Sequence, residues 1–553
     1  MSLLATPGEL QLIVDVESAR AWAELPDATW RRVDEVLGGV PGLRVLATLP
    51  KGGLFKALQK VRVHITPWSN EERELTPVEM SQVALMWRVA RQKFGLVDED
   101  PLNEPGSGVV AAFRPVARAR DSHTTPKDTW EAQPRLPPHA YDPVVLGFSY
   151  LDSQQELSCL LTRGTDCCLE VPAFRWDHEV LYDPDPDMPG KIYTRHGGFI
   201  DGWNNFEGKL FGIERSAVSA IDPQQKKCLE EGANAFHLAG LGKNQLDRAV
   251  VGVYVGVMTY DWYEERVENG IATMDDQPHM LASRVSFLLN LKGPSTNIDT
   301  ACSSSLVACS SAVHAVARKS DDFGLALGVC HMGARKTFVG RCAGHLLSPS
   351  GRSFVFSIGG DGYCRGEGHG AVVFGRREVA HDSGQLQPPQ VASSTVNEDG
   401  KSATLVAPNG PSQQELLRDA LRHARLTPAE VVCCECAANG SAMGDPIEFG
   451  AISKVQLTMA RNDPLVLTSA KSVKGHTEGA SGITGIVKCL LMLQDGVATP
   501  ISHMGSLNAN IDDEDANMLF PNECVELFCD DDLKVGVSAF GFGGTNAHTI
   551  LIA

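Results

Sequence analysis

Short apolar runs that alternate with helical patterns are the feature that most constrains the fold of this chain. Over residues 200–553, runs typical of buried strands occur at residues 250–256, 325–330 and 370–374. A longer apolar run at residues 482–493 has the length of a buried helix. Alternation of this kind predicts a layered α/β domain.

One cysteine stands where a strand-like approach gives way to a helical pattern. The sequence there is Asp299-Thr-Ala-Cys-Ser-Ser-Ser305, and apolar residues follow at helical spacing from Leu306 to Val316. A cysteine in the first turn of a helix lies beside unpaired N–H groups, at the positive end of the helix dipole. Both favour the thiolate, so we predict that Cys302 is a nucleophile. The alternative is a buried structural cysteine, which would describe most of the 15 cysteines.

Further strings of the chain match a known family. The segment around Cys302 resembles the nucleophile segment of β-ketoacyl synthases, specifically the ketosynthase domain of modular type I polyketide synthases. The resemblance covers residues 141–553. Other matching strings, in the family's order, are Val171-Pro-Ala-Phe-Arg-Trp-Asp177, Tyr182-Asp-Pro-Asp-Pro-Asp187, Asp222-Pro-Gln-Gln225, Asp361-Gly-Tyr-Cys-Arg-Gly-Glu-Gly368, Ala407-Pro-Asn-Gly-Pro-Ser-Gln413, Gly444-Asp-Pro-Ile-Glu448, Gly475-His476 and Gly541-Phe-Gly-Gly-Thr-Asn-Ala-His548.

The resemblance implies a fold and a reaction. The fold is α/β and thiolase-like, with two similar halves in five αβαβα layers, usually in a homodimer. The internal duplication is not visible in the sequence. In the family, a cysteine takes an acyl chain from a thioester on the phosphopantetheine arm of an acyl carrier protein, and no cofactor is bound. Two histidines then promote decarboxylation of a malonyl-type extender, and the resulting carbanion attacks the acyl-enzyme.

The same resemblance assigns roles to residues of this chain. Cys302 is the nucleophile, and the segment from Lys471 to Gly475-His476 supplies Lys471 and the second histidine, His476. The backbone N–H groups of Cys302 and Phe542 form the acyl oxyanion hole, and the ring of Phe542 gates the pocket.

The first histidine of the family is missing. The family pattern Glu-Ala-His-Gly-Thr-Gly-Thr-x-Leu-Gly-Asp-Pro is replaced here by Glu435-Cys-Ala-Ala-Asn-Gly-Ser-Ala-Met-Gly-Asp-Pro446. The ungapped register, which we prefer, places Ala437 at the histidine. It places Asn439 and Ser441 at the two pantetheine-binding threonines, where both can still form hydrogen bonds. A gapped register would place Asn439 at the histidine, so neither register supplies one.

This replacement makes the leading hypothesis a non-elongating ketosynthase, which loads an acyl chain onto Cys302 and passes it to a carrier without adding carbons. Loss of an oxyanion donor costs a factor of about 10²–10³ in rate, and loss of proton transfer a further factor of about 10²–10⁴. One alternative is a competent condensing enzyme that recruits His331, His345 or His369. Another is a non-catalytic scaffold that recognises carrier proteins.

The N-terminal part of the chain lies outside the recognised domain. Residues 1–100 predict a small α/β extension, with strands at 10–16 and 43–49 and helices at 17–38 and 76–94. The proline- and glycine-rich residues 101–140 predict a linker. The ketosynthase domain then occupies residues 141–553 and begins with a strand at 143–148. Because no acyltransferase, reductase or carrier sequence follows, we expect a stand-alone ketosynthase or a piece of a larger synthase.

Composition limits the binding partners and the cellular compartment expected for this protein. The net charge of -19 argues against nucleic acid and anionic membranes as partners, but allows a local basic patch for an acidic carrier protein. No apolar stretch reaches the length of a membrane span, and the N-terminus lacks the pattern of a secretory signal. The cysteines lack the spacing of a metal site. We therefore expect them to be reduced thiols of a cytoplasmic protein, with a plastid as the alternative location.

Overall fold

The structure, a computed structural model, describes residues 2–6, 9–13, 43–45, 142–151, 154–378, 387–514, 516–529 and 531–553. The chain divides into two compact units, Met1–Val116 and Ala117–Ala553. The boundary falls inside the segment expected to be a linker, and that segment itself lies outside the described residues.

The first unit contains a small sheet. Strand β2 (Glu9–Ile13) pairs antiparallel with β1 (Ser2–Thr6) and parallel with β3 (Leu43–Val45). The strands expected at 10–16 and 43–49 are therefore present over 9–13 and 43–45, and the rest of each expected range lies outside the described residues. The helices expected at 17–38 and 76–94 lie outside the described residues.

The second unit contains a sheet that is eleven-stranded within the described residues and consists of two halves. The first half has the strand order β4-β10-β9-β7-β8. Strand β10 pairs antiparallel with β4 and β9, whereas β7 pairs parallel with β9 and β8. Its strands are β4 (Pro143–Tyr150), β10 (Gly368–Arg376), β9 (Phe323–Cys330), β7 (Val251–Gly256) and β8 (Ser295–Ile298).

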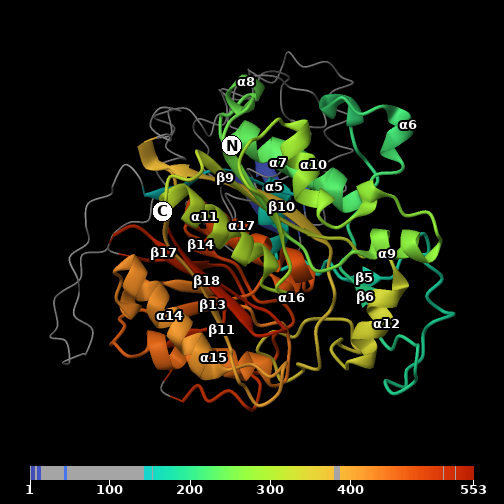
Figure 1. Ribbon diagram of the computed structural model, residues 1–553. Helices are drawn as coiled ribbons and strands as arrows, with labels where there is room; N and C mark the ends of the chain where they lie inside the picture. The colour runs from blue at the N-terminus through green and yellow to red at the C-terminus, as the bar shows by residue number, and fades with distance from the viewer. Residues whose placement is uncertain are drawn as a thin grey trace. The chain divides into compact units, whose positions relative to one another are not determined.

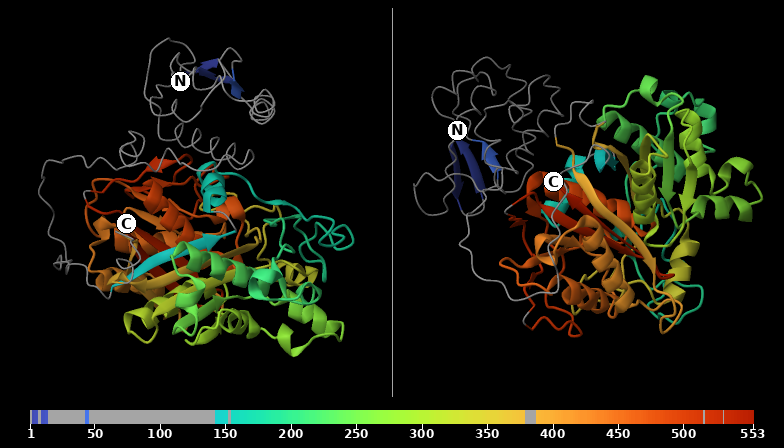
Figure 2. Two further views of the ribbon diagram at one scale, coloured as in Figure 1. Left: turned by 90° about the horizontal axis from the view of Figure 1, so that it is seen from above. Right: turned by 60° about the vertical axis from the view of Figure 1, so that its left-hand side comes forward.

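The second half repeats this pattern. Its order is β11-β18-β17-β12-β13, again with two antiparallel pairs followed by two parallel pairs, and β15 (Met518–Leu519) is added at its edge. Figure 2 shows β4, in cyan, at the seam between the halves, where β4 pairs with β11. The other strands are β11 (Gln390–Glu398), β18 (Thr545–Ile552), β17 (Lys534–Phe540), β12 (Cys433–Glu435) and β13 (Leu465–Thr468).

Helices cover both halves and separate them into layers (Figure 1). Helices α11 (Ser304–Ala317) and α17 (Ser481–Asp495) lie in the middle and pack on strands of both halves. Helices α7 (Pro223–Leu238) and α10 (Met280–Leu288) cover the outer face of the first half. Helices α14 (Gly410–Ala424) and α15 (Gly444–Gln456) cover the second. This arrangement confirms the expected five αβαβα layers of the thiolase-like fold.

The apolar runs of the sequence explain these layers. Every residue of β4 after Pro143 is buried, as expected for a strand covered on both faces. Residues Ser481–Leu493 of α17 are buried on all sides, as expected for a helix between two sheets. Three apolar cores lie between the layers, one in the middle and one under each outer pair of helices. Among the described residues, no helix is long and apolar enough to cross a membrane.

Candidate functional site

Cys302 lies in a tight turn between β8 and α11. The preceding Ala301 has φ of +55°, in the left-handed region that residues with a Cβ rarely adopt. The hydroxyls of the flanking residues fix this turn: the N–H of Thr300 donates to Oγ of Ser304 at 2.9 Å, and the Thr300 and Ser303 hydroxyls lie 2.8 Å apart. Oγ of Ser481, at the start of α17, donates to the carbonyl of Cys302 at 2.8 Å. The turn therefore holds the cysteine at the start of the central helix layer.

The helix begins later than the sequence pattern predicts. Helix α11 starts at Ser304 with Ser303 as its N-cap, so Cys302 precedes the helix and does not lie in its first turn. The pKa of the thiol also differs from the expectation of a thiolate: burial and, to a smaller extent, the Glu478 carboxylate raise the pKa of Cys302 to about 11. The positive charges of Lys471 and Arg341 lower this pKa without overcoming burial. Cys302 is therefore a neutral thiol at neutral pH.

The glycine-rich loop between β17 and β18 closes over this turn. A Cβ at Gly541 would lie 2.3 Å from the carbonyl oxygen of Thr300, so only glycine allows this approach. The backbone N–H of Phe542 is hydrogen bonded to Cys302, and this bond lowers the pKa of the thiol against the larger effect of burial. Phe542 as a whole is exposed. The structure thus places Phe542 beside Cys302, where the sequence placed the oxyanion hole and the gate.

His476 is buried between segments of the two halves. Its backbone N–H donates to the carbonyl of Cys364 at 2.7 Å, and its ring meets that of Tyr363 edge-on with the centroids 5.0 Å apart. The backbone N–H of Glu478 donates to Nδ1 of the ring at 3.1 Å. Burial and, to a smaller extent, the charge of Lys471 lower the pKa of His476 to about 3. The ring is therefore neutral, and its proton resides on Nε2.

Lys471 connects these groups. It is the first residue of the short helix α16 (Lys471–Lys474), and its Nζ donates to the carbonyl of Cys436 at 3.4 Å. Burial has the larger effect on each group, raising the pKa of Cys302 and lowering that of His476, and the positive charge of Lys471 lowers the pKa of both. The structure therefore brings Lys471 and His476, which share one short segment, together with Cys302 from a distant part of the sequence.

Ala437 follows Cys436, the residue whose carbonyl Lys471 contacts, and so lies beside the same site. Its backbone N–H donates to Oε1 of Glu448 at 2.8 Å. Glu448 is buried on α15, and burial raises the pKa of its carboxyl to about 8, although this hydrogen bond and the charge of Lys471 lower it. An alanine methyl group offers neither a proton nor a hydrogen bond, so this position has no acid–base chemistry.

The two positions expected to bind pantetheine lie on the loop after Ala437. The backbone N–H groups of Asn439 and Ser441 donate to Oδ1 of Asp445 at 3.1 and 3.2 Å. Oγ of Ser441 accepts a hydrogen bond from the N–H of Gly444 at 3.1 Å. Asp445 thus holds both residues in one turn at the N-terminus of α15, and both are half-buried.

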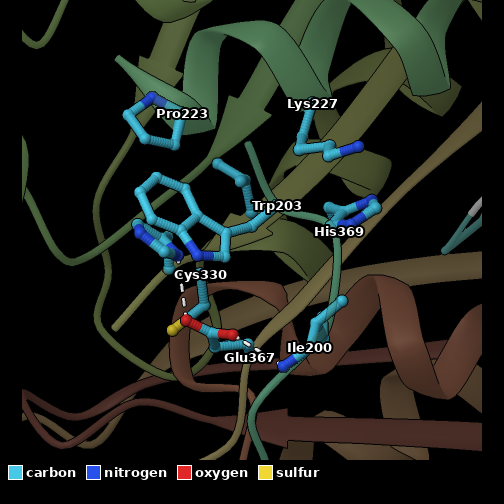
Figure 3. A pocket seen from close by; sticks show the side chains of 9 residues that line it. Ile200, Trp203, Pro223, Lys227, Cys330, Glu367 and His369 are labelled. Atoms are coloured by element: carbon cyan, nitrogen blue, oxygen red, sulfur yellow. Dashed lines mark hydrogen bonds and ion pairs between the residues drawn. The ribbon is translucent and has the colours of Figure 1, made fainter. Parts of the chain in front are cut away.

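Two of the three histidines considered as replacements line a different pocket (Figure 3). In this small pocket, His331 pairs with Glu367 at 2.9 Å and packs on Trp203. His369 faces α7 and pairs with Glu231 at 2.7 Å. Cys302, His476 and Lys471 are not among its lining residues, which all belong to the described chain.

The third, His345, lies at the surface. Its side chain is 57% exposed, and its Nε2 lies 3.5 Å from a carboxylate oxygen of Asp187. Within the described part of the chain, no cluster of three or more His, Cys, Asp or Glu side chains could hold a metal ion.

Sequence reasoning missed a buried ionic cluster beside His476. The carboxylate of Glu478 is held by Arg341 and Arg365, which donate at 2.6–3.1 Å. Arg365, and also the buried Glu448 beside Ala437, lie inside sequence strings that carry the family resemblance. That resemblance was the signal that could have identified these two residues. Arg341 gave no such signal.

Comparisons with known proteins agree on one family. Residues 146–380 match the family model of the N-terminal domain of β-ketoacyl synthase, and residues 390–505 match that of its C-terminal domain. Polyketide synthase GfsA of Streptomyces halstedii is 36% identical over 430 residues, which are 74% of this chain and 6% of that protein. The pikromycin polyketide synthase component PikAII of Streptomyces venezuelae is 37% identical over 410 residues, 72% of this chain and 11% of that protein.

Solved structures give the same result. The oxazolomycin ketosynthase domain OzmH KS7 of Streptomyces albus JA3453 matches with a TM-score of 0.71 and 31% identity, over 74% of each chain. The ketosynthase from module 6 of the bacillaene synthase of Bacillus subtilis 168 matches with a TM-score of 0.69 and 30% identity, over 74% of this chain and 72% of that one. The chain thus spans most of a solved ketosynthase but only a small part of the curated synthases.

Proposed function

This chain belongs to the β-ketoacyl synthase family, as a ketosynthase domain of the modular polyketide synthase type, and we propose that it transfers acyl chains without elongating them. It accepts an acyl chain from a carrier-protein thioester onto Cys302 and passes the chain to a carrier. Ketosynthases of polyketide synthases use acyl groups carried on the phosphopantetheine arm of a carrier protein. The observation that carries the proposal is Cys302 and His476 in one site beside Ala437.

The loading half of the reaction has its groups in place. Sγ of Cys302 attacks the thioester carbonyl, a new C–S bond forms, and the carrier thiol leaves with the proton that the cysteine loses. The N–H groups of Cys302 and Phe542 stabilise the oxyanion of the intermediate. His476 is a poor base, with a pKa of about 3, but its Nε2–H can donate a hydrogen bond. Transfer of the chain to a second carrier thiol is the reverse of this exchange.

The condensing half of the reaction lacks one hydrogen-bond donor for the negative charge that develops when a malonyl group loses carbon dioxide. The family uses two histidines for this charge, and this chain has Ala437 in place of one. Losing both the hydrogen-bond donor and the proton transfer should slow condensation by a factor of about 10⁴–10⁷. Loading depends on Cys302 and Phe542, so it is spared this loss.

Two other functions are less well supported. A condensing enzyme would need a replacement histidine, but His331 and His369 are paired with glutamates in another pocket, and His345 is at the surface. A non-catalytic scaffold would not need the hydrogen-bonded turn around Cys302 or the close approach of Gly541 to it.

Intact-protein mass spectrometry tests the proposal. The protein is incubated with an acyl thioester of N-acetylcysteamine, and a carrier protein with a free phosphopantetheine thiol is then added. We expect an acyl adduct on the protein, followed by the same acyl mass on the carrier. The adduct should be lost in Cys302→Ala and kept in Cys524→Ala, which removes another half-buried thiol. The absence of an adduct on the unmodified chain would contradict the proposal.

The proposal extends to assembly and compartment. Strand β8 is at one edge of the sheet, and its first two residues are exposed, so we propose that two copies pair along this edge as a homodimer. Light scattering at micromolar concentration should give twice the chain mass. All 15 cysteines are free thiols, which favours a reducing compartment such as the cytoplasm.

A further inference from the structure

A carboxylate and two guanidinium groups lie buried beside the site. Arg341, on helix α12 (Arg335–Ala343), donates from Nε to Oε1 of Glu478 at 2.6 Å and from Nη2 to Oε2 at 3.1 Å. Arg365 donates to the same two oxygens, at 2.9 Å each. The side chains of Glu478 and Arg365 are fully buried, and that of Arg341 is 16% exposed. This charge cluster, defined as Arg341, Arg365 and Glu478, has no assigned role.

The cluster fixes an unusual backbone conformation. Glu478 has φ of +44°, in the left-handed region, which is unfavourable for a residue with a side chain. In this conformation its N–H points at Nδ1 of His476. The four hydrogen bonds from the two arginines, together with those from the Tyr363 hydroxyl and the Cys330 thiol, oppose relaxation of this backbone, so they keep the proton of His476 on Nε2.

The cluster also acts on the nucleophile through its charge. Two guanidinium groups and one carboxylate give a net charge of one positive unit. Apart from burial, the charged groups that act on Cys302 are Glu478, which raises the pKa of the thiol, and Lys471 and Arg341, which lower it. They come from three elements, η6 (Glu478–Ala480), α16 and α12. Arg341 therefore offsets the unfavourable effect of Glu478 on the thiolate.

Stability alone does not explain this arrangement. Burying three charged groups costs several kcal/mol of desolvation for each ion, and apolar replacements of buried ion pairs are often neutral or stabilising, by about 1–4 kcal/mol. We propose that Arg341 is a positioning residue of the site: with Arg365 it holds Glu478 against His476, and its charge offsets that of Glu478 at Cys302. This inference rests on the proposed function, because it takes Cys302 and His476 as the reacting groups.

The test compares the rate at which iodoacetamide alkylates Cys302 at pH 8, followed by peptide mass spectrometry, in four variants. Only the thiolate reacts, so the rate follows the thiolate fraction. Arg341→Gln should slow alkylation about threefold to tenfold, as expected for loss of one nearby charge in a partly buried site. Arg341→Lys, which keeps the charge, should restore the rate to within about twofold. Lys336→Gln removes an exposed cation from the same helix and should leave the rate unchanged.

The variant Glu478→Gln distinguishes an electrostatic role of the cluster from a structural one. Loss of the carboxylate should speed alkylation about threefold to tenfold, opposite to the effect of Arg341→Gln. A merely structural role would change both rates in the same direction. Equal rates in Arg341→Gln and the unmodified chain, or slower alkylation of Glu478→Gln, would overturn the proposal. If Arg341→Gln does not fold, the sign of the Glu478→Gln effect decides alone.

The outcome is independent of acyl transfer. If the chain takes up an acyl group but Arg341→Gln alkylates at the normal rate, the cluster proposal fails and the proposed function stands. If no acyl group is taken up but the opposite rate changes are observed, the proposed function fails and the role of Arg341 stands.

Discussion

The backbone N–H of Glu478 donates a hydrogen bond to Nδ1 of His476 over 3.1 Å. This bond defines the state of the histidine, because a nitrogen that accepts a hydrogen bond cannot carry a proton as well. With a pKa of about 3, the ring remains neutral down to acidic pH. We therefore predict that His476 acts in this site as a hydrogen-bond donor and not as its general base.

His476 should make folding stability depend on pH. Its pKa is lowered in the folded state, so between about pH 6.5 and 3 the unfolded chain binds a proton that the folded chain does not. Stability from this group is complete above pH 6.5 and falls as the pH decreases through that range. Urea denaturation should show that His476→Gln loses less stability on acidification, by up to about 1.4 kcal/mol per pH unit. The surface variant His345→Gln should show the same dependence of unfolding free energy on pH as the unmodified chain. Equal pH slopes for all three proteins would show that His476 is not buried as a neutral ring.

Glu448 should have the opposite pH dependence. Burial raises its pKa to about 8, so between about pH 4.5 and 8 the folded chain retains a proton that the unfolded chain releases. Stability from this group is complete below pH 4.5 and is lost as the pH increases through 8. Glu448→Gln should therefore gain stability relative to the unmodified chain as the pH increases from 5 to 8, by up to about 1.4 kcal/mol per unit. Glu415→Gln, at an exposed position of α14, is the control, and a constant difference for Glu448→Gln would contradict the raised pKa.

Introducing a histidine at Ala437 should restore condensation. The position follows the carbonyl that Lys471 contacts and is half-buried, so an imidazole there would supply the missing donor. With malonyl-loaded carrier, Ala437→His should release carbon dioxide at least about 10²-fold faster than the unmodified chain. Ala438→His, one residue along, is the matched control and should show no gain. Decarboxylation at the same rate in Ala437→His and the unmodified chain would show that Ala437 is not the lost histidine position.

A second buried ion pair holds the strand that leads to Ala437. Nζ of Lys488, on α17, lies 2.6 Å from Oε2 of Glu435, and both side chains are buried. Lys488→Met should lower the free energy of unfolding by about 3–5 kcal/mol, because it leaves a buried carboxylate without its cation. The surface pair of Arg195 and Glu179 is the comparison, and Arg195→Met should lower the free energy of unfolding far less than Lys488→Met. A similar small loss in both variants, measured by urea denaturation, would mean that the buried pair is not structurally important.

The sequence predicted most of the architecture because each layer has its own apolar pattern. The runs at residues 250–256, 325–330 and 482–493 became β7, β9 and α17, with shifts of two residues or fewer at each end. The duplication was expected only from the family resemblance, because the two halves share their strand order and directions without sharing visible sequence repeats. Only the pairing of the strands reveals it.

The sequence proposed residues for the site, but it could not predict their electrostatics. Local pattern placed Cys302 in a helix, but the hydroxyl bonds of Thr300 and Ser303 delay the helix by two residues. The pKa of the thiol depends on burial and on distant charges such as Arg341, and neither can be read from neighbouring residues. The residue roles carried over from the family remain predictions.

A single-turnover extension assay tests the central claim most directly. The protein is loaded with an acyl chain on Cys302, mixed with excess malonyl-loaded carrier protein, and the carrier is weighed by mass spectrometry over time. The account predicts that the original acyl chain appears on free carrier thiols and that no chain longer by two carbons forms, whereas Ala437→His produces the longer β-ketoacyl chain. Formation of the β-ketoacyl carrier by the unmodified chain, at a rate equal to that of Ala437→His, would contradict it.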